Sequence, residues 1–74
     1  MTFDEFEKLI VGKRIIAIEH GESLYKHRIG IESFTVEGNI RVSLYGAADY
    51  TMIEDVDIID EDGKYIRSLT VDRN

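Results

Sequence analysis

The sequence predicts a single α+β domain over residues 1–74, with one short N-terminal helix packed on a curled, mainly antiparallel sheet of about five strands. Three observations predict this fold. The chain opens with the signature of a helix N-terminus, it ends with a β-hairpin, and short alternating segments separated by turns lie between them. Short connections favour pairing between consecutive strands, so we expect a meander, which strong bending would curl toward a barrel.

The helix is expected over Phe3–Val11. Thr2 and Glu5 have the spacing of a capping box, in which the Thr2 side chain accepts from the Glu5 amide and the Glu5 side chain returns to the Thr2 backbone. Gly12 suits the position just after a helix. Apolar residues recur at helical spacing: Phe3, Phe6, Leu9 and Ile10.

The middle of the chain predicts strands of differing clarity. Arg14–Glu19 is apolar on both faces, which indicates an interior strand, or one that the helix covers on one side. Alternation changes phase near Gly30–Ser33, so residues 24–37 form either one strand with a β-bulge or two short strands. Ile40–Tyr45 alternates cleanly, as in a half-buried strand. Tyr50–Ile53 either extends the next strand or forms one helical turn.

The hairpin at residues 54–72 is the clearest element. An Asp-Gly pair separates two runs rich in β-branched and aromatic residues, which is typical of a tight hairpin turn. In the first run, Val56 and Ile58 fall on one face of the strand. Asp55 and Asp57 fall on the other, because side chains alternate along a strand.

Composition limits the function classes. The 74 residues include no cysteine, which excludes disulfides and thiolate chemistry, and no apolar run approaches the roughly 20 residues of a membrane span. The N-terminus lacks the features of a signal peptide, so we expect a cytoplasmic protein that does not enter membranes. The net charge of −6 disfavours direct binding to nucleic acid.

The charge is uneven along the chain. Residues 42–74 hold eight acidic and three basic side chains, a net charge of −5, and no Lys or Arg lies between Arg41 and Lys64. The first hypothesis is therefore a non-enzymatic interaction module, such as an inhibitor, that presents carboxylates to a basic or nucleic-acid-binding protein. The candidate partner-binding residues are Asp55, Asp57, Asp60, Glu61 and Asp62. The alternative is a solvated strand face and turn that protect the sheet from edge-to-edge pairing.

The same acids do not predict a metal site. Asp57, Asp60 and Asp62 offer oxygen ligands, but their spacing does not match a calcium-binding loop. No motif predicts a cofactor, a catalytic triad or a phosphate-binding glycine loop, so we expect no enzyme.

A second hypothesis is a small-ligand-binding protein. It rests on the one cationic, aromatic cluster of the chain: His20, Tyr25, Lys26, His27 and Arg28. Tyr25 would stack on a nucleotide and the basic side chains would bind phosphate. In a catalytic version, His20 or His27 would be the base and Glu22 would orient it. The alternative is an amphipathic strand with Lys26 and Arg28 in water.

A third hypothesis is a homodimeric structural or accessory protein. Chains this small often bury further surface by dimerising, through a strand edge and exposed tyrosines. The tyrosines that would contribute are Tyr25, Tyr45, Tyr50 and Tyr65. The alternative is that these rings are only partly covered because the domain is small.

Overall fold

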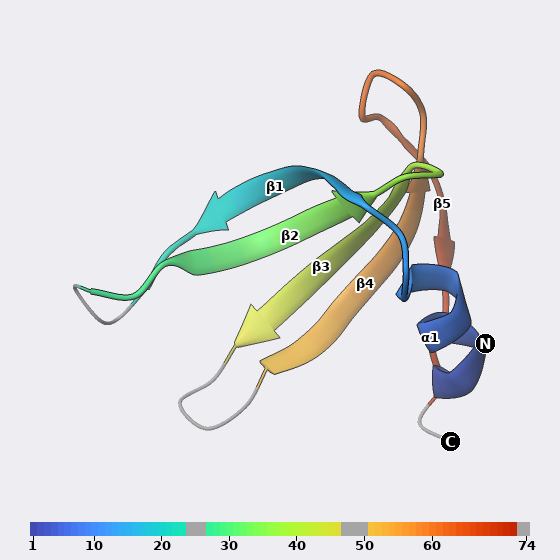
Figure 1. Ribbon diagram of the computed structural model, residues 1–74, viewed down its shortest axis with the longest axis horizontal. Coiled ribbons are helices and arrows are strands. Elements are labelled where there is room, and N and C mark those ends of the chain that lie inside the picture. Colours follow the sequence, from blue (N-terminus) through green and yellow to red (C-terminus); the bar gives the residue numbers. More distant parts are fainter. Residues whose placement is uncertain (24–26, 47–50, 73–74) are drawn as a thin grey trace.

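The computed structural model describes residues 1–23, 27–46 and 51–72, and it confirms the α+β class. One helix, α1 (Phe3–Ile10), precedes five strands. The strands are β1 (Ile15–Gly21), β2 (Gly30–Val36), β3 (Ile40–Gly46), β4 (Thr51–Ile59) and β5 (Tyr65–Leu69). They pair antiparallel in the order β1-β2-β3-β4-β5, as the predicted meander requires (Figure 1). The sheet is not closed into a barrel, and β1 and β5 form its two edges.

The predicted capping box begins the helix. The amide of Glu5 donates to the Thr2 hydroxyl at 3.2 Å, and the amide of Thr2 donates to the Glu5 carboxylate at 3.0 Å. The helix ends at Ile10, and Gly12 follows with φ of +85°, a conformation that glycine adopts without steric cost. The two ends of the chain lie side by side, because the amide of Asp72 donates to the carbonyl of Met1 at 2.6 Å (Figure 1).

One face of the sheet carries the core. Val42 lies directly opposite Phe34 on β2 and Val56 on β4, and paired residues share a face. Phe6 of α1 packs into this set, so the helix lies on that face. The buried residues of the cluster are Phe6, Val36, Ile40, Val42 and Val56.

The prediction that Arg14–Glu19 is covered was wrong. This segment forms β1 at the edge of the sheet, and Ile15, Ile16 and Ile18 are 56%, 56% and 58% exposed. A meander that begins with this strand leaves it at one edge, and Figure 1 shows α1 beside β5, at the other side of the sheet. Here, apolar residues on both faces belong to an exposed edge strand.

The structure bears on two open points of the sequence analysis. Of residues 24–37, Gly30–Val36 form a strand, residues 27–29 do not, and residues 24–26 lie outside the described residues. The β1–β2 pairing passes from Glu19 opposite Ser33 to His20 opposite Ile31, so it skips Glu32 and places a β-bulge inside the predicted interval. Residues 51–53 belong to β4, which favours the strand over the helical turn. Tyr25, Lys26 and Tyr50 lie outside the described residues.

Truncating Phe6 should unfold the protein. Phe6 is 7% exposed and joins the helix to the sheet, so Phe6→Ala should cost about 3–5 kcal/mol. A domain of this size has a total stability of only about 3–5 kcal/mol, so most molecules should be unfolded in circular dichroism at 25 °C. Phe3 is the matched control, since it lies on the same helix and is 49% exposed. Equal losses for Phe3→Ala and Phe6→Ala would contradict this packing.

The capping box should make stability depend on pH. The backbone and then the side chain of Thr2 hydrogen-bond to the Glu5 carboxylate, and these bonds hold the pKa of Glu5 below its ordinary value of 4.5. A depressed pKa contributes stability that is present above the unfolded value and lost as the pH falls through the folded value. Glu5→Gln should therefore reduce the difference in urea midpoint between pH about 7 and about 3. Glu7→Gln, on the same helix, should leave that difference unchanged.

Candidate functional site

Polar side chains gather on the face of the sheet opposite the helix. Two rows cross the strands there by direct pairing, and together we call them the polar face. The first row runs through Glu19, Ser33, Ser43 and Asp55. The second row runs through Thr35, Arg41, Asp57 and Ser68. Asp55 and Asp57 therefore share a face, as their spacing predicts.

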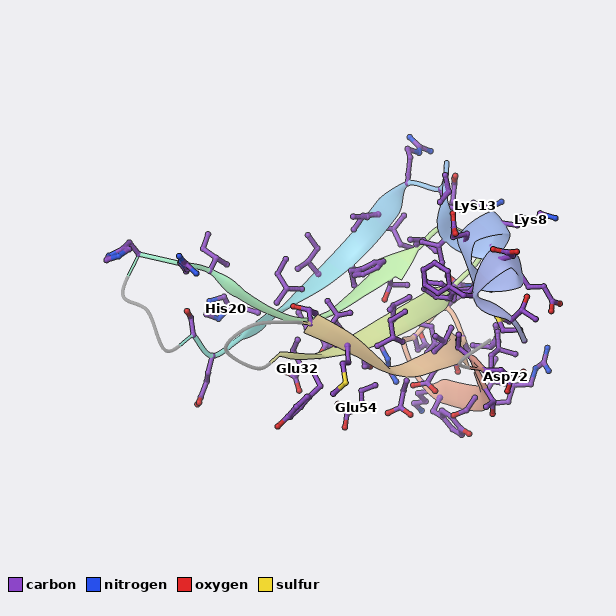
Figure 2. All side chains as sticks on the ribbon, turned by 90° about the horizontal axis from the view of Figure 1, so that it is seen from below. Lys8, Lys13, His20, Glu32, Glu54 and Asp72 are labelled. Carbon is purple, nitrogen blue, oxygen red and sulfur yellow. The ribbon has the colours of Figure 1, made fainter. Side chains whose placement is uncertain are left out.

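This face is hollowed into an open groove of about 390 Å³. Its lining, which we call the polar groove, consists of Glu19, Glu32, Ser33, Arg41, Ser43, Glu54, Asp55 and Asp57. Figure 2 shows Glu32 and Glu54 on the side of the sheet away from Lys8 and Lys13. The sheet thus separates these carboxylates from Lys8 and Lys13.

Two β-bulges bring additional carboxylates to the groove. The β1–β2 pairing skips Glu32, and the β3–β4 pairing skips Glu54 between Asp55 and Ile53. A bulge places two consecutive residues opposite one, so it breaks the strict alternation of faces. Glu32 therefore lines the groove beside Ser33, and Glu54 lines it beside Asp55.

Asp57 is buried and paired. It is 8% exposed, its carboxylate lies 3.6 Å from the Arg41 guanidinium, and it accepts a hydrogen bond of 2.8 Å from the Ser68 hydroxyl. The second row of the polar face therefore contains a satisfied ionic network. The alternative of a solvated strand face is therefore wrong for Asp57, because Arg41 and Ser68 on the neighbouring strands contact its carboxylate. The role of Asp57 in binding a partner stays a prediction.

The remaining carboxylates of the groove lack counter-charges. In the described part of the chain, no Lys or Arg forms an ion pair with Glu19, Glu32, Glu54 or Asp55. Negative charges held on one rigid sheet make the local electrostatic potential more negative. The low-dielectric walls of the groove reduce the screening of these charges by water. The groove is therefore a site of concentrated negative potential.

Ser33 adds a hydroxyl at the floor of the groove. The residue is only 3% exposed, and its Oγ has no hydrogen-bond partner among the described residues. A buried hydroxyl without a partner costs about 1–3 kcal/mol of stability. A group that enters the groove and donates to this oxygen would remove that cost.

The turn acids have a different role from the groove. The Asp60 carboxylate accepts from the amides of Asp62 and Lys64 at 2.9 Å and 2.8 Å, which shapes the β4–β5 turn around Gly63 (φ +81°). Glu61 and Asp62 are exposed there. The structure therefore divides the predicted acidic set between the groove and the turn.

The cationic cluster does not line a hollow in the described part of the chain. His20 is an exposed residue of β1, and His27 and Arg28 are exposed in the connection to β2. A second hollow of about 550 Å³ lies at this end of the sheet, and its described lining includes Glu22 and Glu32 but no basic side chain. The ligand-binding hypothesis stays a prediction, since Tyr25 and Lys26 lie outside the described residues.

Comparisons add no function. No family model, curated protein or solved structure gave a significant match to the chain. Within residues 1–23, 27–46 and 51–72, no group of three or more His, Asp or Glu side chains is placed to hold a metal ion. In the same ranges, no helix has the length and apolarity needed to cross a bilayer.

Sequence reasoning missed six of the eight residues that line the polar groove. Four of the six reach the groove through cross-strand pairing, which depends on register: Glu19, Ser33, Arg41 and Ser43. Glu32 and Glu54 reach the groove through β-bulges, which no turn residue in the sequence predicts. The change of phase at Gly30–Ser33 predicts a bulge in the interval that contains Glu32, and no comparable signal predicts the bulge at Glu54.

The buried ion pair should matter more than an exposed one. Arg41→Met leaves Asp57 without its partner at a site where the side chains are 24% and 11% exposed, so we expect a loss of about 2–3 kcal/mol. Arg14→Met removes a 3.9 Å pair with Glu37 in which the Arg side chain is 87% exposed, and should cost less than about 1 kcal/mol. Urea unfolding of both variants measures the two losses in the free energy of unfolding. Equal losses would contradict the prediction, because they would show that the Asp57 carboxylate does not need Arg41 to remain buried.

Proposed function

We propose that this protein is a non-enzymatic interaction module whose polar groove binds a basic side chain of a protein partner. The observation that carries the proposal is a set of four carboxylates around the buried hydroxyl of Ser33, none of which has an ion-pair or hydrogen-bond partner among residues 1–23, 27–46 and 51–72. The carboxylates and the hydroxyl come from three strands of one sheet, β1, β2 and β4, so the sheet holds them at fixed separations.

A guanidinium or ammonium group matches this chemistry. Both are cations that carry several N–H donors and no acceptor, and the four carboxylates of the groove are acceptors. The one cation that lines the groove, Arg41, is paired with Asp57. Ser33 Oγ would accept one further donor at the floor of the groove. Charge-assisted hydrogen bonds of this kind are roughly twice as strong as neutral ones.

The two carboxylates at the ends of the first row also suit a partner that binds nucleic acid. Neighbouring strands lie roughly 4.8 Å apart, so side chains that follow one row are spaced regularly across the sheet. Glu19 and Asp55 end such a row, with Ser33 and Ser43 between them. A basic groove that normally neutralises phosphates would meet negative charges on a rigid scaffold here, which supports a role as an inhibitor.

Neutralising the groove should weaken binding to a basic probe. We expect Glu54→Gln with Asp55→Asn to lower the affinity for a labelled nine-residue arginine peptide by at least about tenfold at low salt, and to flatten its salt dependence. Fluorescence anisotropy over a salt series gives both quantities. Amide shifts in NMR should be largest at Ser33 and Ser43 in the unmodified protein.

The matched control is Glu61→Gln with Asp62→Asn. This variant removes the same two charges at the β4–β5 turn, where both residues are exposed and neither lines the groove. Its affinity for the arginine peptide should fall by less than about threefold, because distant exposed charges are screened. If both double variants lose affinity equally, binding follows net charge and the groove is not the site.

A further inference from the structure

The edge strand β1 exposes three isoleucines to solvent. Ile15, Ile16 and Ile18 are all more than half exposed, although they follow one another along a single strand. The outer backbone groups of β1 pair with no other described strand, because β1 ends the sheet. A long, exposed, apolar edge is a template for pairing with another strand.

The bulge in β1 gives this edge an unusual symmetry. Ile15 lies opposite Val36 and Ile18 lies opposite Phe34, and both of these β2 residues belong to the core face. The pairing skips Ile16, so Ile15 and Ile18 share one face although they are three residues apart. Glu19 lies on the polar face opposite Ser33. Arg14 directly precedes β1 and continues the pairing by accepting from the amide of Glu37, so alternation from Ile15 places Arg14 on the polar face too. Its side chain is 87% exposed although its guanidinium lies 3.9 Å from the Glu37 carboxylate.

Antiparallel pairing of this strand with its own copy is therefore self-complementary. With the symmetry axis between Ile16 and Ala17, Ile15 lies opposite Ile18 of the second copy. Arg14 then lies opposite Glu19 of the second copy, and the two-fold axis repeats both pairs. Opposite charges and β-branched pairs directly across two strands are stabilising, and here all of them form between residues that share a face.

We propose that the protein forms a two-fold symmetric homodimer in which β1 pairs with β1 of a second copy in this register. The dimer would join two five-stranded sheets into one continuous sheet and cover the exposed isoleucines of both. The other edge, β5, fits less well. It is shorter, with five residues against seven, and β1–β5 pairing between copies would be head-to-tail and would not close.

A charge exchange tests the register. Sedimentation equilibrium of the unmodified protein should show a dimer when the protein concentration is raised to about 0.5 mM. Glu19→Arg alone and Arg14→Glu alone each place like charges opposite one another twice, so each should raise the dimer dissociation constant by about tenfold or more. The double variant Arg14→Glu with Glu19→Arg restores both attractive pairs, and it should return the dissociation constant to within about threefold of the original.

A matched pair of substitutions tests the edge. Ile16 lies on the edge strand β1 and Ile66 on the edge strand β5. Each is the residue that the pairing of its strand skips, and each is 56% exposed. Ile16→Lys should dissociate the dimer, whereas Ile66→Lys on β5 should not, and circular dichroism checks that both remain folded. A monomer at every concentration, dissociation by Ile66→Lys alone, or failure of the double exchange to restore the dimer would each overturn the proposal.

Discussion

The register of β3 against its two neighbours is the constraint on which the rest of the structure depends. It places Val42 between Phe34 and Val56 on the core face, and by the same pairing it places Ser43 between Ser33 and Asp55 on the polar face. A slip by one residue would move Arg41 and Asp57 into the core and the valines into water, because side chains alternate with a period of two. The partly buried Arg41–Asp57 pair therefore supports the register from the opposite face, since its charges have no compensated position in any neighbouring register. Core and groove are thus two consequences of one pairing.

Departures from regular pairing, more than the strands themselves, shape the polar groove and the β1 edge. In a regular strand Glu32 and Ser33 would point to opposite faces, and so would Glu54 and Asp55. The bulges at Glu32 and Glu54 turn two more carboxylates toward the groove, and the bulge at Ile16 aligns Ile15 with Ile18 along the edge. Each bulge also bends its strand and increases the local twist. Such bending does not close this sheet, whose ends β1 and β5 stay apart in the pairing order, so both edges and the polar face remain available for interactions.

The elements that the sequence predicts well are those whose signals are local. The helix with its capping box depends on Thr2 and Glu5, three residues apart, and the hairpin depends on adjacent Asp62 and Gly63. The face shared by Asp55 and Asp57 follows from alternation alone. The burial of Asp57, the place of Ser33 and the exposure of β1 depend instead on which strands become neighbours, and no local pattern encodes that. The burial of β1 was predicted wrongly for a physical reason. Apolar residues on both faces of a strand favour contact with other apolar groups, but they do not show whether those groups belong to this chain or to another.

The groove and the β1 edge belong to one surface if the dimer forms. A two-fold axis perpendicular to the joined sheet keeps Ile15 and Ile18 of both copies on one side, so the two polar faces also lie together on the other side. Two chains of net charge −6 repel each other, and a basic partner that occupies both grooves would relieve that repulsion while gaining from effective concentration. Binding free energies are linked reciprocally, so whatever factor dimerisation adds to the affinity for such a partner, the partner adds to the affinity of the two copies for each other. The carboxylates of the groove and the isoleucines of β1 would then act together. Repulsion between the carboxylates of the two copies weakens the dimer when no partner is bound. A partner with basic residues at matching separation removes that repulsion.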